Sequence, residues 1–126
     1  MADKKILIAD DDRTITMTAN MFFSGRGYSV VTANNGEDAL RVFNEEKPGY
    51  ILLDVVMPRK SGFEVCQNIR EKDKENKIVI VIFSGKIEGV EKGFDFGADD
   101  CLTKPINWDD CVERMEELGK EKSQIV

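Results

Sequence analysis

The sequence contains no histidine, and this absence excludes several kinds of chemistry. Without an imidazole side chain, the protein cannot form a Ser-His-Asp or Cys-His catalytic unit, a zinc site with histidine ligands or a phosphohistidine of its own. Any chemistry must therefore use carboxylates, hydroxyls, lysine or a hard metal ion.

Cysteine is scarce, and long apolar runs are missing. The three cysteines, Cys66, Cys101 and Cys111, lack metal-ligand spacing, and an odd number is a poor basis for a disulfide framework. We therefore expect reduced thiols in a cytoplasmic protein. The longest apolar run, 78–83, is too short to cross a bilayer, and the first residues contain no apolar segment of the signal-peptide type. We expect a soluble domain without membrane contact.

Basic side chains are outnumbered, since 18 Lys and Arg against 24 Asp and Glu give a net charge of -6. This surplus of carboxylates argues against nucleic acid as a partner, because phosphates are neutralised by clustered Lys and Arg. A length of 126 residues with 41% apolar content suits one domain with a real core. No repeat, low-complexity segment or linker divides the sequence. We expect one domain over 1–120 and a short polar tail over 121–126.

Short apolar runs alternate with amphipathic stretches of helical length. The predicted strands are 6–9, 28–33, 51–53, 78–83 and 100–103. The predicted helices are approximately 14–25, 36–46, 60–71, 87–96 and 107–119, and Asn35 is placed to cap the second of them. Five successive strand-helix units predict a parallel sheet covered by helices on both faces. Such a sheet places its functional residues at the carboxyl ends of its strands.

Polar residues follow four of the predicted strands. They are Asp10-Asp11-Asp12 after the first strand, Asp54 after the third, Ser84 after the fourth and Lys104-Pro105 after the fifth. Neighbouring carboxylates repel one another unless a cation neutralises them, and Mg²⁺ binds one or two carboxylates together with waters and phosphoryl oxygens. Ser84 and Lys104 would hydrogen-bond and neutralise such a phosphoryl group. The sequence therefore predicts a magnesium and phosphoryl site at this edge.

These motifs resemble those of the receiver domains of two-component response regulators, over residues 4–119. The matching segments are 5–12 (KILIADDD), 52–58 (LLDVVMP) with a following glycine, 81–85 (VIFSG) and 97–105 (GADDCLTKP). The resemblance implies an α/β fold, in which a doubly wound, flavodoxin-like parallel sheet with strand order 2-1-3-4-5 is accompanied by five helices. It also implies a signalling protein rather than an enzyme, with only self-phosphorylation from a donor and slow autodephosphorylation.

The resemblance assigns a role to each acidic residue at the predicted edge. Asp54 matches the aspartate that accepts a phosphoryl group from a phosphohistidine. Asp10 and Asp11 match the acidic pair that holds Mg²⁺ together with Asp54, and the backbone carbonyl of Val56 matches the usual further ligand. Because this chain has no histidine, the phosphohistidine must lie on a histidine kinase or a histidine phosphotransfer protein.

Five more positions follow from the same resemblance. Ser84 and Lys104 match the residues that bind phosphoryl oxygens and move when the domain switches. Pro58, Gly62 and Pro105 match structural positions, and the Lys104–Pro105 peptide bond is expected to be cis.

Two surfaces are expected to contact partners. Phosphorylation would be read by a downstream protein at the fourth helix, the fifth strand and the fifth helix. In the first helix, Met17, Met21, Phe22 and Phe23 have the spacing of a core stripe, and an exposed part of it would contact the histidine-bearing donor. Because the sequence ends soon after the fifth predicted helix, we expect a stand-alone, monomeric regulator.

The sequence departs from the family pattern at three places. Cys101 stands where many receivers have a switching Tyr or Phe, and we interpret it as a small packing residue. The interval from Ser84 to Lys104 is shorter than usual, and Gly89 and Gly93 lower helix propensity there. We therefore expect residues 85–93 to be the most flexible part of the unphosphorylated domain. Arg13 also occupies a position where many relatives have a different residue.

Two other functions fit parts of the pattern. The segment 10–14 resembles the first motif of haloacid-dehalogenase-type phosphohydrolases, with Asp10 as nucleophile, Asp12 as acid/base and Asp99-Asp100 on the metal. That interpretation leaves Asp54 unexplained and offers no segment to cap a substrate. A flavodoxin-like electron carrier would share the fold, but three aspartates after the first strand would repel the phosphate of FMN.

Overall fold

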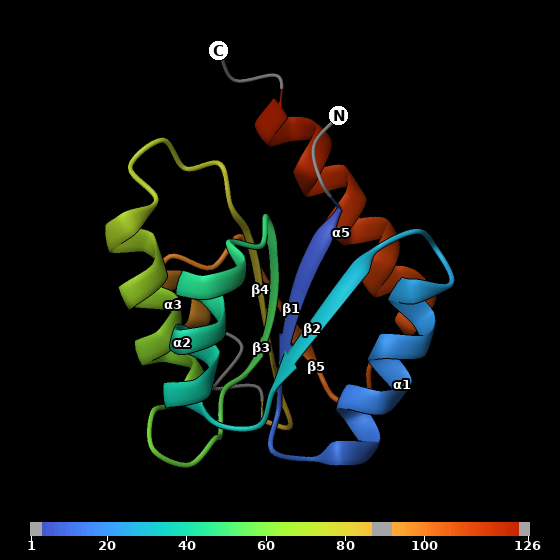
Figure 1. Ribbon diagram of the computed structural model, residues 1–126, viewed down its shortest axis with the longest axis horizontal. Helices are drawn as coiled ribbons and strands as arrows, with labels where there is room; N and C mark the ends of the chain where they lie inside the picture. The colour runs from blue at the N-terminus through green and yellow to red at the C-terminus, as the bar shows by residue number, and fades with distance from the viewer. Residues whose placement is uncertain (1–3, 87–91, 124–126) are drawn as a thin grey trace.

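The computed structural model describes residues 4–86 and 92–123, which form a five-stranded parallel sheet with helices on both faces (Figure 1). The strands are β1 (Lys5–Ala9), β2 (Ser29–Ala33), β3 (Tyr50–Asp54), β4 (Val79–Ser84) and β5 (Asp100–Thr103). The helices are α1 (Arg13–Ser24), α2 (Gly36–Glu46), α3 (Gly62–Lys72) and α5 (Trp108–Ser123). Residues 92–95 are also helical, whereas 87–91 of the predicted fourth helix lie outside the described residues.

The strand order β2-β1-β3-β4-β5 confirms the predicted doubly wound topology. Helices α1 and α5 cover one face of the sheet, and α2 and α3 cover the other (Figure 1). The side chains of β1, β3 and β4 are almost completely buried because these strands have helices on both sides. None of the described helices is long and apolar enough to cross a membrane.

Polar side chains cap the helices that begin at the carboxyl edge of the sheet. Asp12 accepts a hydrogen bond from the Thr14 N–H at 2.9 Å, and Asn35 accepts one from the Asp38 N–H at 2.8 Å. Each cap satisfies a backbone N–H that has no partner within its own helix. The loop that carries Asp10 and Asp11 is therefore fixed at both ends, by β1 and by the capped helix α1.

The last helix is longer than predicted. Residues 121–126 were expected to form a polar tail, but α5 continues to Ser123. The buried Lys122 explains the difference, because its ammonium lies 3.0 Å from the Asp99 carboxylate and donates hydrogen bonds to Asn76. Buried contacts of this kind stabilise a helical turn that sequence pattern alone assigns to solvent.

Gly62 packs against the end of β3, and a side chain at this position is expected to destabilise the fold. A Cβ on Gly62 would overlap the backbone carbonyl oxygen of Asp54, which cannot move without disturbing the strand. We expect Gly62→Ala to lower the free energy of unfolding by about 2–3 kcal/mol in urea denaturation. Gly49→Ala is the matched control, because a Cβ there meets nothing within 4 Å. Equal stability of the two variants would contradict this account of Gly62.

Candidate functional site

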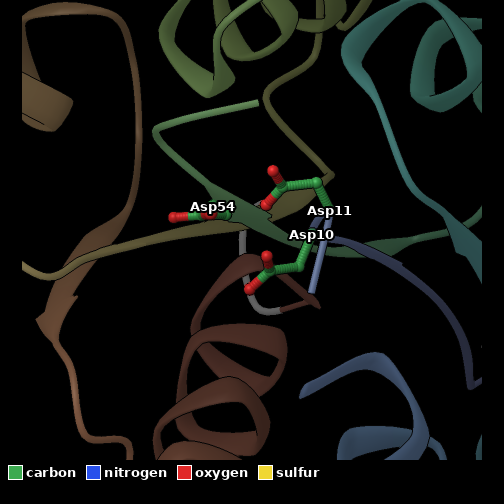
Figure 2. A group of neighbouring side chains, drawn as sticks. All are labelled: Asp10, Asp11 and Asp54. Atoms are coloured by element: carbon green, nitrogen blue, oxygen red, sulfur yellow. The ribbon is translucent and has the colours of Figure 1, made fainter. Parts of the chain in front are cut away.

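The residues predicted from the strand ends lie together at the carboxyl edge of the sheet. Asp10 and Asp11 follow β1, Asp54 ends β3, Ser84 ends β4 and Lys104 follows β5. One carboxylate oxygen from each of Asp10, Asp11 and Asp54 lies within 4.8 Å of the other two. Figure 2 shows these three side chains projecting to the same side of the strand ends. The cluster therefore matches the donor set that a hard divalent cation prefers.

Burial differs sharply among the three carboxylates. Asp10 and Asp54 are 1% and 4% exposed, whereas Asp11 is exposed to solvent. Asp10 accepts a hydrogen bond from the Asp12 N–H at 2.9 Å, which holds its side chain across the start of the loop. Two carboxylates are thus removed from water, and the third borders the solvent.

Lys104 supplies the positive charge of the site. Its ammonium lies 3.3 Å from Asp10 Oδ2 and 3.5 Å from Asp54 Oδ2. It also lies over the face of the Phe83 ring, 5.1 Å from the ring centre, where the ring attracts the positive charge. The Lys104–Pro105 peptide bond is cis, as the family resemblance implied. One ammonium faces two buried carboxylates and therefore leaves an excess of negative charge.

Removal from water raises the pKa values of the two buried acids. Burial raises the pKa of Asp10 to about 7, and the negative charge of Asp54 adds to the increase. The N–H of Asp12 and the ammonium of Lys104 oppose it only in part. Burial likewise raises the pKa of Asp54, against the influence of Lys104. The metal-free site is therefore electrostatically unfavourable near neutral pH, and a bound cation would relieve the repulsion.

Ser84 lies beside this cluster and is fixed by the backbone. Its side chain is buried, and its hydroxyl accepts a hydrogen bond from the Lys86 N–H at 3.1 Å. The Ser84 carbonyl accepts a hydrogen bond from the Lys104 N–H at 2.8 Å, which joins the ends of β4 and β5. The two residues expected to contact a phosphoryl group are therefore on adjacent strands and linked through the main chain.

The loop after β3 is held by its backbone. The Gly62 N–H donates to the Val55 carbonyl at 2.9 Å, and the Gly36 N–H donates to the Pro58 carbonyl at 3.2 Å. Val56 is exposed, and its backbone N–H lowers the pKa of Asp54 against the effect of burial. Pro58 and Gly62 thus brace the loop that follows Asp54.

Cys101 is buried in β5 and packs against residues 92–95. A Cβ on Gly93 would overlap the Cys101 sulfur, so the helical turn and the strand approach each other closely at this point. Gly93 therefore has a packing role, in addition to its low helix propensity. The predicted flexibility of 85–93 falls largely on 87–91, outside the described residues.

The three thiols are expected to be unreactive in the folded protein. Burial raises the pKa of Cys66 and Cys111 to about 12 and that of Cys101 to about 11. Little thiolate exists at about pH 8 under these conditions, and thiolate is the reactive form. A colorimetric thiol reagent should modify these residues only after denaturant unfolds the protein. Native-state labelling as fast as that of a free cysteine would show that the thiols are accessible.

The carboxylates required by the hydrolase interpretation do not meet. Asp99 lies at the amino end of β5, whereas Asp10 lies at the carboxyl end of β1, so the two are at opposite ends of the parallel strands. There Asp99 pairs with Arg70 at 2.7 Å. Asp100 pairs with Arg114 at 2.6 Å, and the Asp12 side chain caps α1. Asp99 and Asp100 therefore form ion pairs away from the cluster, whereas Asp54, which that interpretation leaves unused, belongs to the cluster.

The topology and the acidic edge together define a class of protein, the flavodoxin-like α/β domains with a carboxylate cluster at the carboxyl ends of β1 and β3. Residues 6–116 match the family described as the response regulator receiver domain, and the chain belongs to that family. The family resemblance and the fold predicted from the sequence are confirmed. The protein is thus a receiver domain of two-component signal transduction.

Named relatives and solved structures agree with this membership. The chain is 39% identical over 104 residues to the "Probable transcriptional regulator ycf27" of Guillardia theta, covering 82% of this chain and 41% of that protein. It is 38% identical over 107 residues to the "Alkaline phosphatase synthesis transcriptional regulatory protein PhoP" of Bacillus subtilis, covering 83% and 44%. The receiver domain of the Francisella response regulator 1452 superposes with a TM-score of 0.84 at 29% identity, covering 94% of this chain and 98% of that one. The CheY-like receiver of Methanospirillum hungatei superposes at 0.88 and 25% identity, covering 96% and 97%.

The chain spans about half the length, or less, of the curated relatives that it matches. Both relatives described above, from Guillardia theta and Bacillus subtilis, are named as transcriptional regulators. The expected absence of a nucleic-acid partner therefore remains a prediction for this domain.

Proposed function

We propose that this receiver accepts a phosphoryl group on Asp54 from a phosphohistidine of a partner protein, in a Mg²⁺-dependent reaction, and signals by phosphorylation-dependent binding. One observation carries the proposal: the buried Asp54 carboxylate lies within reach of two further carboxylates and the Lys104 ammonium. The partner would be a histidine kinase or a histidine phosphotransfer protein, because the chain itself has no histidine.

In this reaction, a carboxylate oxygen of Asp54 attacks the phosphorus atom of the phosphohistidine. A new O–P bond forms as the N–P bond breaks, and the imidazole leaves with its electron pair. The Lys104 ammonium, now 3.5 Å from Asp54, would neutralise one phosphoryl oxygen, and the Ser84 hydroxyl would donate to another. The protein thus positions and neutralises the group that it receives.

Three carboxylates and one carbonyl are proposed to hold the metal ion. Asp11 and Asp54 would bind Mg²⁺ directly, Asp10 largely through water, and the backbone carbonyl of Val56 would complete the protein ligands. The bound cation would supply charge neutralisation for the phosphoryl oxygens. The raised pKa values of Asp10 and Asp54 support this proposal, because they show that two carboxylates are buried where their ionised forms are unfavourable without a cation.

Donor binding is proposed at α1. Met17 and Met21 are 66% and 76% exposed, so these two members of the predicted stripe are on the surface, while Phe23 is in the core. Beside α1, an open hollow of about 500 Å³ is lined by Ile15, Lys104, Pro105, Ile106 and Trp108. An apolar surface that adjoins Lys104 would let a donor bury side chains while its histidine reaches Asp54.

The phosphorylated state is proposed to be read at the fourth helix, β5 and α5. Lys104 directly follows β5, and its backbone is bonded to Ser84 at the end of β4. A movement of Ser84 and Lys104 toward a phosphoryl group would therefore be transmitted to these elements. The domain would act by binding its targets rather than by catalytic turnover.

Treatment with a small acyl phosphate tests the proposal without knowledge of the natural donor. We expect one phosphoryl group per protein by intact mass in Mg²⁺, and none in excess chelator. Repeated turnover of the donor with a label on Asp10 would instead support the phosphohydrolase interpretation.

A further inference from the structure

A small polar hollow lies on the other side of the α1 start from the apolar one. It has a volume of about 180 Å³ and is lined mainly by Arg13 and Thr16 of α1, Thr32 and Asn34 from the end of β2, and Asp38 and Arg41 of α2. Because α1 and α2 cover opposite faces of the sheet, the two arginines approach the hollow from opposite sides of the edge strand β2. No site residue assigned above lines this hollow.

Positive charge predominates in the hollow, although the whole chain carries a net charge of -6. Within the part of the chain that the structure describes, Arg13 forms no ion pair. Arg41 lies 3.6 Å from Asp38 and 3.3 Å from Glu45, but its side chain is 57% exposed, so water screens both pairs. The Asp38 carboxylate also accepts a hydrogen bond from the Asn35 amide. Two guanidinium groups thus face one carboxylate that already has other partners.

The hollow adjoins the phosphoryl site. The Asp10 N–H donates to the Ala33 carbonyl at 3.1 Å, and Ala33 lines the hollow. Since β2, β1 and β3 are consecutive strands, the end of β2 lies about 10 Å from Asp54 at the usual strand spacing. A protein interface of standard size covers about 800 Å² on each partner. A donor protein seated over Asp54 therefore also covers the hollow.

We propose that Arg13 and Arg41 form a specificity site for a carboxylate side chain on the phosphohistidine-bearing donor. The inference rests on the proposed function, because it takes the occupant to be that donor. A guanidinium binds a carboxylate through two parallel hydrogen bonds, and the hydroxyl of Thr32 and the amide of Asn34 offer further donors at the rim. The start of α1 would then read two features of the donor, an apolar group on the α5 side and an acidic group on the α2 side.

Titrations monitored through backbone amide NMR signals test this site with two probes, a tetraglutamate peptide and inorganic phosphate. In the wild-type protein, the peptide is expected to shift the amide signals of Thr32 and Asn34. In the variant that combines Arg13→Gln and Arg41→Gln, its affinity should fall by about fivefold or more. Arg59→Gln is the matched control, because Arg59 is an exposed arginine on the loop after β3 that pairs with Glu37 outside the hollow. Its affinity for the peptide should equal that of the wild type.

Three results would overturn the proposal. Equal peptide affinities in the wild type and the double variant would show that the two arginines do not bind the peptide. Amide signal shifts confined to Ser84 and Lys104 would place peptide binding at the phosphoryl site. Binding of phosphate but not of peptide at Thr32 and Asn34 would indicate a free anion rather than a protein carboxylate.

Phosphorylation by the small acyl phosphate should be unchanged in the double variant. A wild-type protein that accepts no phosphoryl group would refute the proposed function, and the peptide titration would still report on the hollow.

Discussion

Replacing Asp54 by asparagine is expected to abolish phosphoryl acceptance. An amide oxygen is a poor nucleophile and cannot form an acyl phosphate, and the substitution would also remove one of the three proposed carboxylate ligands of the metal ion. Because the side chain keeps its shape within a buried site, the fold should remain intact. Intact mass after treatment with a small acyl phosphate and Mg²⁺ should show no modified protein, whereas the wild type gains one phosphoryl group.

Asp12→Asn is the matched control for this variant. Asp12 lies in the same acidic run, but its side chain caps α1, and asparagine is an equally good capping residue. We expect Asp12→Asn to accept a phosphoryl group like the wild type. Full phosphorylation of Asp54→Asn together with its loss in Asp12→Asn would reverse the assignment in favour of the hydrolase interpretation.

Replacing Asp10 by asparagine is expected to stabilise the metal-free protein while weakening its response to Mg²⁺. The carboxylate is buried, and its pKa is raised from 3.8 to about 7, so ionised Asp10 opposes folding. Asparagine can still accept the hydrogen bond from the Asp12 N–H, without the negative charge. We expect the free energy of unfolding at about pH 7.5 to rise by about 1–3 kcal/mol. The stabilisation that Mg²⁺ confers should become smaller.

The pH dependence gives this prediction a definite sign. Between about pH 4 and pH 7, the folded state keeps the Asp10 proton that the unfolded state has already lost. The contribution of Asp10 to the free energy of unfolding is therefore highest below about pH 4. It falls as the pH rises from about 4 to about 7, and it is constant above that range. Urea denaturation of the metal-free protein should show this decline, and Asp10→Asn should reduce it.

Asp11→Asn separates the loss of a proposed metal ligand from the removal of a buried charge. Asp11 also belongs to the carboxylate cluster but is exposed to water. This variant should lose Mg²⁺ affinity without the gain in metal-free stability. If Asp10→Asn made the metal-free protein no more stable than Asp11→Asn does, burial of the Asp10 charge would not be the source of the unfavourable energy.

The sheet and the positions of the site residues were predictable because both follow from local sequence patterns. Apolar runs of strand length define β1, β3 and β4, and a parallel sheet places Asp10, Asp54 and Lys104 at one edge without further information. Asn35 was predicted to cap α2 from its place before a helical stretch, and the structure confirms it.

Properties that depend on packing between distant segments could not be predicted in this way. The high pKa of Asp10 arises from the depth of its burial, which the sequence does not encode locally. The extension of α5 depends on contacts of Lys122 with Asp99 and Asn76, both far away in the chain. The hollow between Arg13 and Arg41 combines side chains from two faces of the sheet, and only the Arg13 position stood out in the sequence.

The most direct test of the central claim is to locate the phosphoryl group on the wild-type protein. After treatment with a small acyl phosphate and Mg²⁺, reduction with borohydride converts an aspartyl phosphate into a stable derivative that mass spectrometry assigns to one residue. The proposed function predicts this derivative at Asp54 alone, and its absence when a chelator replaces Mg²⁺. A derivative at Asp10 or Asp11, or one at Asp54 that forms equally well without the metal ion, would contradict it.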